Sequence, residues 1–346
     1  METFERLPHI SAKIDEFVEW IEKSQKILVT MHCRPDGDAA GSAIAFMHIL
    51  RSMGKDVVAF NVDEIPCQFS FLNGAECVVH DISDCAKDID LCVVLDCADP
   101  GLLGRKFPFD KLHCPYAYVD HHAVSYDKCV VNVHDSKASA VGEIIYHIMC
   151  RLGVELTIDI AAALYTSIIT DTGSFRYTST SADCLRISSI LVAQGIDVWD
   201  ICSHIYEDNP AEKLRLLGYV LQTLWISKNG KLAALHANRS MLRKCHCSGA
   251  MTDGFINYAR SIHGVEVSIF LTQLEDDLYR LSFRSRGHID VSLIAASFGG
   301  GGHKMPPPAH YVVPSNRSAT KSKLSSKTNS KISPNAPKPE PLSAQI

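Results

Sequence analysis

A short stretch near the start of the chain places a histidine and two aspartates after an apolar run. Residues 26–31 are Lys-Ile-Leu-Val-Thr-Met, and His32, Asp36 and Asp38 follow at the spacing His-x-x-x-Asp-x-Asp. Imidazole and carboxylate groups are suitable ligands for a divalent metal ion. The same residues also have an ordinary structural explanation, because Asp-Gly is common in turns and Asp38 is a good helix N-cap. The stretch by itself does not decide between these alternatives.

Two further predicted strands end in ionisable side chains. Residues 91–95 form a continuous apolar run, which is typical of a strand buried on both faces. Residues 116–119 form a shorter strand, and a helical pattern covers residues 158–170. The ionisable residues that directly follow these three segments are Asp96, Asp120, His121, His122 and Asp171. Parallel strands share one carboxyl edge, where open α/β sheets bind ligands, so we expect the groups that follow the three strands to gather there, and Asp171 completes the set.

A cluster of so many acidic groups needs a compensating charge. Burying an ionised carboxylate costs on the order of several kcal/mol of folding free energy. A bound cation would offset this cost. Four aspartates and two histidines are enough for two cations, with one aspartate shared between metals about 3.5–4 Å apart. The sequence therefore predicts a dinuclear metal site at this edge of the sheet.

The elements that must position these groups alternate between strand and helix. Apolar residues recur at helical spacing from Ile10 to Ile21, which predicts an amphipathic helix packed on the first strand. The remaining predicted elements of this part are the strands 56–62 and 77–80 and the helices 39–53, 138–152, 158–170, 182–194 and 198–206. This rhythm predicts an α/β fold, with a parallel sheet flanked by helices.

The segment 207–212, Glu-Asp-Asn-Pro-Ala-Glu, predicts a domain boundary. We expect a first domain at 1–207, a smaller α/β domain at 208–313 and a tail at 314–346, with a cleft between the two domains. The elements expected in the smaller domain are a connecting helix at 214–224, strands at 231–236, 265–274 and 278–284, and a helix at 291–298 that runs into four glycines and His303. A hairpin is expected around residues 276–277.

Composition narrows the class of protein. The chain has 346 residues, of which 46% are hydrophobic and 21% charged, and no apolar run reaches membrane-spanning length. The N-terminus lacks a basic segment followed by an apolar one, so we expect no export signal and a cytoplasmic location. The 13 cysteines are odd in number and scattered, which favours reduced thiols. The tail carries six basic residues against one glutamate and no aromatic residue, which predicts disorder.

The order of these motifs resembles that of the DHH phosphoesterases, and within them the oligoribonuclease and pAp-phosphatase group. The motifs are His-x-x-x-Asp-x-Asp at 32–38, Asp96, Asp-His-His at 120–122, Thr-Asp-Thr-Gly-Ser-Phe at 170–175 and the glycine run with its histidine at 299–303. The resemblance covers residues 1 to about 304. It implies a DHH domain followed by a DHH-associated substrate-binding domain, and it assigns metal ligation to His32, Asp36, Asp38, Asp96, His121 and Asp171.

The resemblance also implies individual roles. Asp96 matches the ligand shared by both metals, His122 faces the substrate phosphate, and Asp120 orients a ligand histidine. The implied catalytic residues are Asp38, Asp96 and His122. The residues implied to bind substrate are His122, Arg284, Gly300, Gly301, Gly302 and His303.

The implied reaction is hydrolysis of short oligoribonucleotides or of 3′-phosphoadenosine 5′-phosphate (pAp) by metal-activated water. Two divalent cations are expected, with Mn²⁺ favoured over Mg²⁺ or Co²⁺ by the mixed ligands. A linear-dinucleotide phosphodiesterase, a single-strand exonuclease, a pyrophosphatase of the same superfamily and a non-catalytic nucleotide-binding relative are the alternatives. We expect a short RNA or nucleotide as partner and no membrane, and the resemblance is compatible with a homodimer.

The resemblance stops after Lys304. Family members continue with Ala-Ala-Gly and a further strand and helix, whereas this chain continues Met-Pro-Pro-Pro-Ala-His at 305–310. Three prolines forbid a helix there. We therefore expect the end of the smaller domain to be missing, with Val267, Ile269 and Leu281 exposed. A frame change near the codon of Lys304 and a genuine lineage-specific tail are both open explanations.

Overall fold

The computed structural model describes residues 9–82, 88–122, 126, 128–276, 278–286, 289, 291 and 294, and the backbone of 309–314. The chain forms two units, Met1–Asp208 and Asn209–Ile346. The sequence placed the domain boundary after residue 207. The expected tail beyond 314 and the expected cleft between the domains lie outside what is described and stay predictions.

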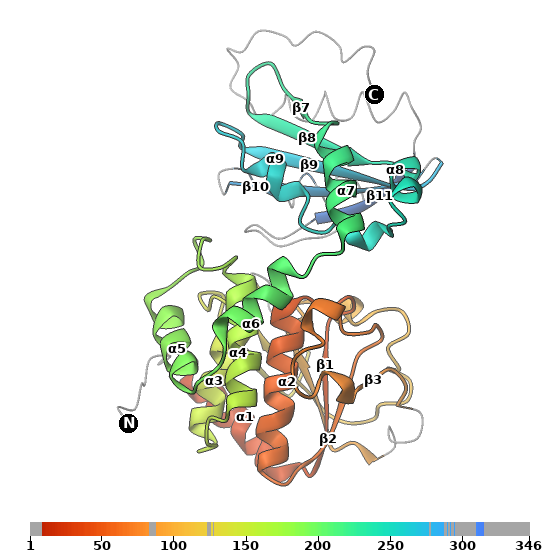
Figure 1. Ribbon diagram of the computed structural model, residues 1–346. Coiled ribbons are helices and arrows are strands. Elements are labelled where there is room, and N and C mark those ends of the chain that lie inside the picture. Colours follow the sequence, from red (N-terminus) through yellow and green to blue (C-terminus); the bar gives the residue numbers. More distant parts are fainter. Residues whose placement is uncertain are drawn as a thin grey trace, which may run out of the picture. The chain divides into compact units, whose positions relative to one another are not determined.

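The larger unit is built on a parallel sheet, as the alternation of elements predicts (Figure 1). Its strands lie in the order β3-β2-β1-β4-β5-β6, and every neighbouring pair is parallel. The three strands that end in ionisable residues, β1, β4 and β5, are direct neighbours. The strand bounds are β1 Lys26–Met31, β2 Asp56–Phe60, β3 Val78–Val79, β4 Leu91–Leu95, β5 Tyr116–Asp120 and β6 Val131–His134.

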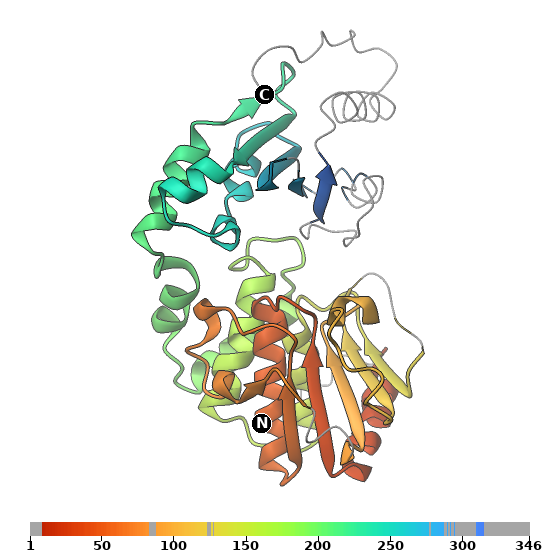
Figure 2. The same cartoon turned by 90° about the vertical axis from the view of Figure 1, so that its right-hand side faces the viewer.

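The central strands are covered on both faces, which explains their continuous apolar sequences. In β1, Ile27, Val29 and Met31 face the core shared with the helices, whereas Leu28 faces the opposite side. That opposite side is closed by the irregular segment between β4 and β5, through Leu103 and other residues. The strands point the same way in Figure 2, so their carboxyl ends share one edge.

The helices of the larger unit follow the predicted segments closely. Their bounds are α1 Ser11–Lys23, α2 Gly37–Ser52, α3 Val141–Arg151, α4 Ile158–Asp171, α5 Ala182–Ala193 and α6 Val198–Cys202. The last predicted helix is divided, because α6 gives way to a π-helix at Ser203–Glu207, next to the boundary between the units. Short 3₁₀ turns at Cys67–Phe69, Ala75–Cys77 and Pro100–Leu103 complete this unit.

The smaller unit contains a mixed sheet with the strand order β11-β10-β9-β8-β7. β8 and β9 are parallel, and the other neighbours are antiparallel, including the predicted hairpin of β9 and β10. The bounds are α7 Ala211–Leu221, β7 Trp225–Ile226, β8 Leu232–Ala237, α8 Arg239–Lys244, α9 Ile256–Arg260, β9 Val267–Glu275 and β10 Leu278–Ser285. A 3₁₀ turn at Gly249–Thr252 precedes α9. The predicted helix 291–298 falls almost entirely outside the described residues.

The sequence predicted that the smaller domain lacks the strand that should follow β10, and this prediction is wrong. Residues Ala309–Pro314 form β11, which pairs antiparallel with β10 from Leu278 to Phe283. Val267 and Ile269 are each 7% exposed and Leu281 is 2% exposed, so these side chains are buried. The prolines at 306–308 precede the strand rather than interrupt it, and β11 is an edge strand, where a terminal proline is tolerated.

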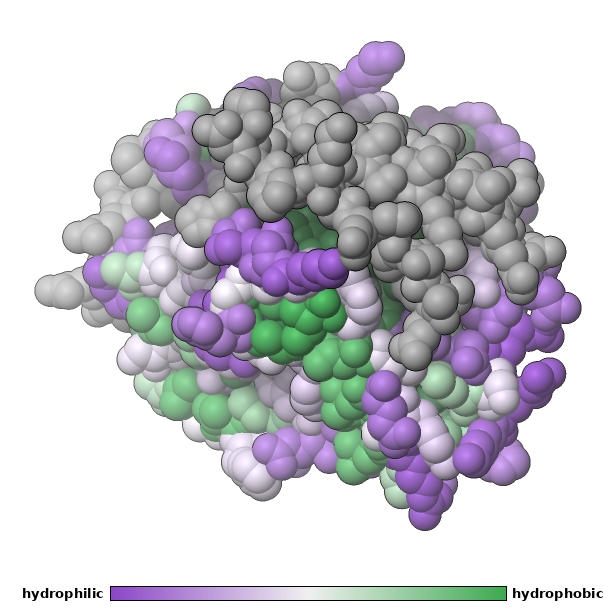
Figure 3. All heavy atoms as spheres, turned by 90° about the horizontal axis from the view of Figure 1, so that it is seen from above, coloured by the Kyte–Doolittle hydropathy of each residue, from purple (hydrophilic) through white to green (hydrophobic). Residues whose placement is uncertain are grey.

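No helix in the described part of the chain is long and apolar enough to cross a membrane. Single large apolar side chains are nevertheless exposed, among them Trp199 in the larger unit and Leu214 in the smaller one. Exposure of single apolar side chains is normal for a globular protein. On the face drawn in Figure 3, hydrophobic residues also gather in a patch near the middle, with hydrophilic residues around it.

Candidate metal centre

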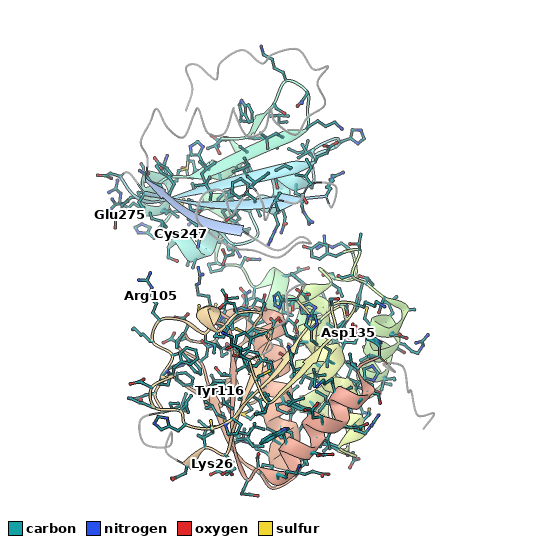
Figure 4. The ribbon with its side chains drawn as sticks, turned by 180° about the vertical axis from the view of Figure 1, so that it is seen from behind. Lys26, Arg105, Tyr116, Asp135, Cys247 and Glu275 are labelled. Carbon is teal, nitrogen blue, oxygen red and sulfur yellow. The ribbon has the colours of Figure 1, made fainter. Side chains whose placement is uncertain are left out.

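The carboxyl edge of the parallel sheet brings the predicted residues together. Figure 4 shows the polarity of the strands, with Lys26, the first residue of β1, at one end of the sheet and Asp135, which follows β6, towards the other. His32 directly follows β1. Its Nδ1 donates a hydrogen bond to the carbonyl of Cys33 at 2.9 Å, which leaves Nε2 available as a ligand. Asn61, at the end of β2, donates to the carbonyls of Met31 and His32 and so fixes the backbone there.

Asp36 and Asp38 have different surroundings although they are two residues apart. Asp36 is exposed and is the N-cap of α2, accepting hydrogen bonds from the amides of Asp38 and Ala39 at 3.1 Å. The N-cap of α2 is therefore Asp36, two residues before Asp38, which the sequence suggested as the N-cap. Asp38 is 1% exposed and accepts hydrogen bonds from the amides of Val141 and Gly142, at the N-terminus of α3.

Asp96 follows β4 and is held in an unusual backbone conformation. Its φ is +53°, in the left-handed region, which costs a residue with a side chain about 1–2 kcal/mol. The side chain is buried between two histidines, with Oδ2 3.5 Å from His32 Nε2 and Oδ1 3.7 Å from His121 Nε2. Asp96 Oδ1 is buried and has no hydrogen-bond partner in the described part of the chain.

The end of β5 carries both histidines of the Asp-His-His motif. Asp120 Oδ1 accepts hydrogen bonds from the backbone amide of His121 at 2.8 Å and from His122 Nδ1 at 2.5 Å. His121 Nδ1 donates to the carbonyl of Ala138, so its Nε2 faces the carboxylates. His134, the last residue of β6, donates from Nε2 to the carbonyl of His122. The motif is therefore fixed at both its side chains and its backbone.

Asp171 ends α4 and precedes a left-handed turn. Gly173, Ser174 and Phe175 all have φ between +56° and +61°. Thr172 stabilises this turn, because its hydroxyl donates to the carbonyl of Ile168 and accepts from the amide of Phe175. The turn reverses the chain directly after Asp171, whose Oδ2 lies 3.6 Å from His121 Nε2.

These side chains form three groups whose potential ligand atoms lie within 4.8 Å of one another. The groups are His32, Asp36 and Asp96; Asp38, His121 and Asp171; and Asp96, His121 and His122. Asp96 and His121 each occur in two of them. The donor set, and the buried partnerless oxygen of Asp96, fit a pair of divalent cations.

The raised pKa values in the cluster also favour a site for cations. Burial opposes protonation of His121, but the charges of Asp171, Asp38 and Asp96 raise its pKa to about 10. Burial raises the pKa of Asp171 to about 6, opposed by His121 and reinforced by Asp36 and Asp96. Burial and the charge of Asp96 likewise hold the pKa of Asp38 well above its ordinary value. Without cations, His121 and Asp38 thus keep their protons to a higher pH than usual, and a bound metal would displace these protons.

The residues expected to bind substrate in the smaller unit are only partly described. Arg284 lies within β10, opposite Ser268 of β9. Arg286, the residue directly after β10, donates to the carbonyls of Arg260, Ser261 and Ile262 and so has a structural role. Gly300, Gly301, Gly302 and His303 lie outside the described residues, and their role stays a prediction.

Three residues that support the cluster were not predicted from the sequence. Asn61 directly follows β2, and His134 is the last residue of β6. The strand-end pattern would have identified both if these two strands had been predicted with the observed bounds. Ser167 lies on α4, four residues before Asp171 and hence on the same face of the helix. Its hydroxyl is 2.5 Å from Asp38 Oδ1.

Comparison with known proteins gives consistent matches over most of the chain. Residues 26–168 match the model of the DHH family, N-terminal domain. The chain is 30% identical over 283 residues to the bifunctional oligoribonuclease and PAP phosphatase NrnA of Thermus thermophilus, which covers 80% of this chain and 81% of the relative. It is 26% identical over 294 residues to the protein of the same name from Bacillus subtilis, covering 84% and 90%.

A solved structure is also similar to this chain over most of its length. The exopolyphosphatase-related protein from Bacteroides fragilis superposes with a TM-score of 0.80 at 27% sequence identity, and the match covers 87% of this chain and 91% of that protein. The similarity therefore extends across both units rather than the sheet alone.

Proposed function

Because the chain belongs to the DHH family of phosphoesterases, we propose that it is a metal-dependent hydrolase of short oligoribonucleotides and of pAp. Hydrolysis of phosphoesters is the chemistry of the family. The two substrates are those in the names of the relatives from Thermus thermophilus and Bacillus subtilis.

The observation that carries the proposal is the position of Asp96 between two sets of potential ligands. One carboxylate oxygen faces His32 and the other faces His121. A carboxylate shared in this way is the usual link between two metal ions that act together on a phosphoester. In the proposal, His32, Asp36 and Asp96 would hold one cation, and Asp96, Asp38, His121 and Asp171 would hold the other.

Divalent cations in such a site activate water as the nucleophile and neutralise charge on the phosphoryl oxygens. The protein contributes the fixed orientation of its ligands. The hydrogen bonds from Nδ1 of His32 and His121 to carbonyl oxygens keep one proton on Nδ1, so Nε2 of each ring is the nitrogen that would bind a metal once its own proton is displaced. The hydrogen bond to Asp120 turns Nε2 of His122 away from that carboxylate, so that it can contact a substrate phosphate.

The smaller unit would bind the nucleotide. Arg284 would offer a planar pair of donors for a phosphate, and the glycines at 299–302, which lie outside the described residues, would let backbone amides approach one closely. The glycine run is not followed by the Lys-Ser/Thr of a P-loop, which argues against a nucleoside triphosphate as the substrate.

The test is direct hydrolysis by the purified protein. The protein is incubated with Mn²⁺ and either pAp or RNA of two to five nucleotides, and released phosphate or mononucleotide is measured. We expect turnover of at least one substrate that stops with EDTA and returns with Mn²⁺. Absence of turnover on both substrates with Mn²⁺, Mg²⁺ and Co²⁺ would contradict the proposal.

A further inference from the structure

Ser167 makes an unusual hydrogen bond for a serine inside a helix. Its hydroxyl donates to Asp38 Oδ1 at 2.5 Å, although the two residues belong to different helices and lie 129 positions apart. The hydroxyls of Ser188 and Thr170 instead donate to a carbonyl one turn earlier in their own helix, that of Cys184 and that of Thr166. Ser167 therefore serves a contact between helices.

The two oxygens of Asp38 have separate partners. Oδ1 accepts from Ser167 and, at 3.3 Å, from the amide of Gly142. Oδ2 accepts from the amide of Val141 at 2.8 Å and lies 3.5 Å from His121 Nε2. The hydroxyl of Ser167 thus holds the oxygen that points away from His121, which leaves Oδ2 facing the group of Asp38, His121 and Asp171.

The junction of α2, α3 and α4 leaves little room for another arrangement. A Cβ atom on Gly142 would lie 2.2 Å from Ser167 Oγ, and one on Gly41 would lie 2.8 Å from the backbone nitrogen of Ser167. Ser167 also accepts a hydrogen bond from the amide of Gly142 at 2.9 Å. The hydroxyl is fully buried and held between one donor and one acceptor, so its orientation is fixed.

We propose that Ser167 is a positioning residue that locks the carboxylate of Asp38 in the orientation required to bind one of the two cations. This inference rests on the proposed dinuclear site. Loss of the hydroxyl leaves Asp38 Oδ1 with one weaker donor and lets the carboxylate rotate. The affected cation is the one held by Asp38, His121 and Asp171, whereas the one held by His32, Asp36 and Asp96 keeps its ligands.

The test compares Ser167→Ala with Ser188→Ala, which removes another buried hydroxyl that makes no contact with the cluster. Mn²⁺ binding to the metal-free full-length proteins is measured by calorimetric titration at one fixed pH. In Ser167→Ala, we expect one Mn²⁺ equivalent to bind about 10- to 100-fold more weakly, as for other groups that orient a metal ligand. The second equivalent should bind as in the wild type, and Ser188→Ala should retain both affinities.

The outcomes are distinguishable. Two unchanged affinities in Ser167→Ala would overturn the role of Ser167 and leave the proposed function standing, whereas a wild-type protein that binds no Mn²⁺ would overturn both. If Ser167→Ala does not fold, Ser167→Cys provides the measurement, because a thiol has nearly the same shape as the hydroxyl but is only a weak hydrogen-bond donor to Asp38 Oδ1. Loss of affinity for one equivalent supports the proposal, and unchanged binding contradicts it.

Discussion

The carboxylate of Asp120 and the imidazole of His122 are joined by a hydrogen bond of 2.5 Å between Oδ1 and Nδ1. The same oxygen accepts the amide of His121, so one buried aspartate orients two consecutive histidines. Burial disfavours the ionised form of Asp120, but the hydrogen bond and charge of His122 outweigh it and lower the pKa of this carboxyl. Asp120 thus stays ionised and keeps the Nδ1 proton of His122 in place.

Replacing Asp120 with asparagine tests this orientation. The amide can still accept from the backbone, but it no longer carries the charge that stabilises the ring of His122. We expect kcat/KM for pAp or short RNA to fall about 10- to 100-fold. The matched control is Asp90→Asn, because Asp90 accepts two backbone amides, of Gln25 and Lys26, at the other end of the sheet. Equal activity in the two variants would contradict the role of Asp120.

Asp96 is expected to be indispensable for turnover. Asp96→Ala removes the only carboxylate in the described cluster that faces both His32 and His121. Activity should fall by more than the roughly 100-fold typical of residues that only support a ligand, with loss of at least one bound metal. Circular dichroism should show an unchanged fold, because Asp96 Oδ1 has no hydrogen-bond partner in the described part of the chain that the substitution would remove. Substantial Mn²⁺-dependent activity in this variant would refute the assignment.

Metal binding should depend on pH in a defined direction. Between pH 6 and 10 the metal-free cluster keeps Asp171 ionised and His121 protonated, given pKa values of about 6 and about 10. A cation must displace the proton of His121, so Mn²⁺ affinity should rise with pH. The proton of His121 alone corresponds to about a tenfold gain in affinity per pH unit. The raised pKa of Asp38 can add to this slope, and the dependence should steepen below pH 6, where Asp171 is also protonated. Titrations from pH 5.5 to 8.5 measure this slope, and a flat profile would contradict it.

Arg284 is expected to bind substrate without affecting the metals. Arg284→Ala should lower kcat/KM about 10- to 100-fold, because a charged hydrogen bond to phosphate contributes about 1.5–3 kcal/mol. The content of bound metal should not change. Arg286→Ala removes the same charge from a residue bonded to three carbonyls, and we expect it to affect the melting temperature more than kcat/KM. Loss of metal in Arg284→Ala would show that Arg284 belongs elsewhere.

The strand β11 should stabilise the smaller unit. A chain that ends after residue 308 lacks β11 and leaves β10 as the edge of the sheet, next to the buried Leu281. We expect its melting temperature to fall by about 5 °C or more, since 1 kcal/mol shifts a small domain by about 4–8 °C. A chain that ends after residue 314 keeps the strand and should melt like the full chain. Identical melting of both truncated proteins would show that β11 contributes nothing.

The sequence alone predicted the three central strands β1, β4 and β5 and the ionisable residues at their carboxyl ends. Leu91–Leu95 was predicted with the observed bounds, because a strand buried on both faces requires a continuous apolar run that is visible in the sequence. The carboxyl edge then followed from the geometry of parallel strands, which places His32, Asp96 and His121 together wherever the helices lie. Val131–His134 was missed because an edge strand alternates polar and apolar residues over only a few positions.

Contacts between elements distant in sequence depended on the tertiary structure. The hydrogen bond from Ser167 to Asp38 and the amides of α3 that hold the same carboxylate join three helices, and no local pattern indicates such a contact. The pairing of β11 with β10 likewise requires the sheet of the smaller unit to exist first. Local periodicity determines which residues face the core and which end a strand. The orientation of each ligand is decided by donors that only the packed helices bring within hydrogen-bond distance.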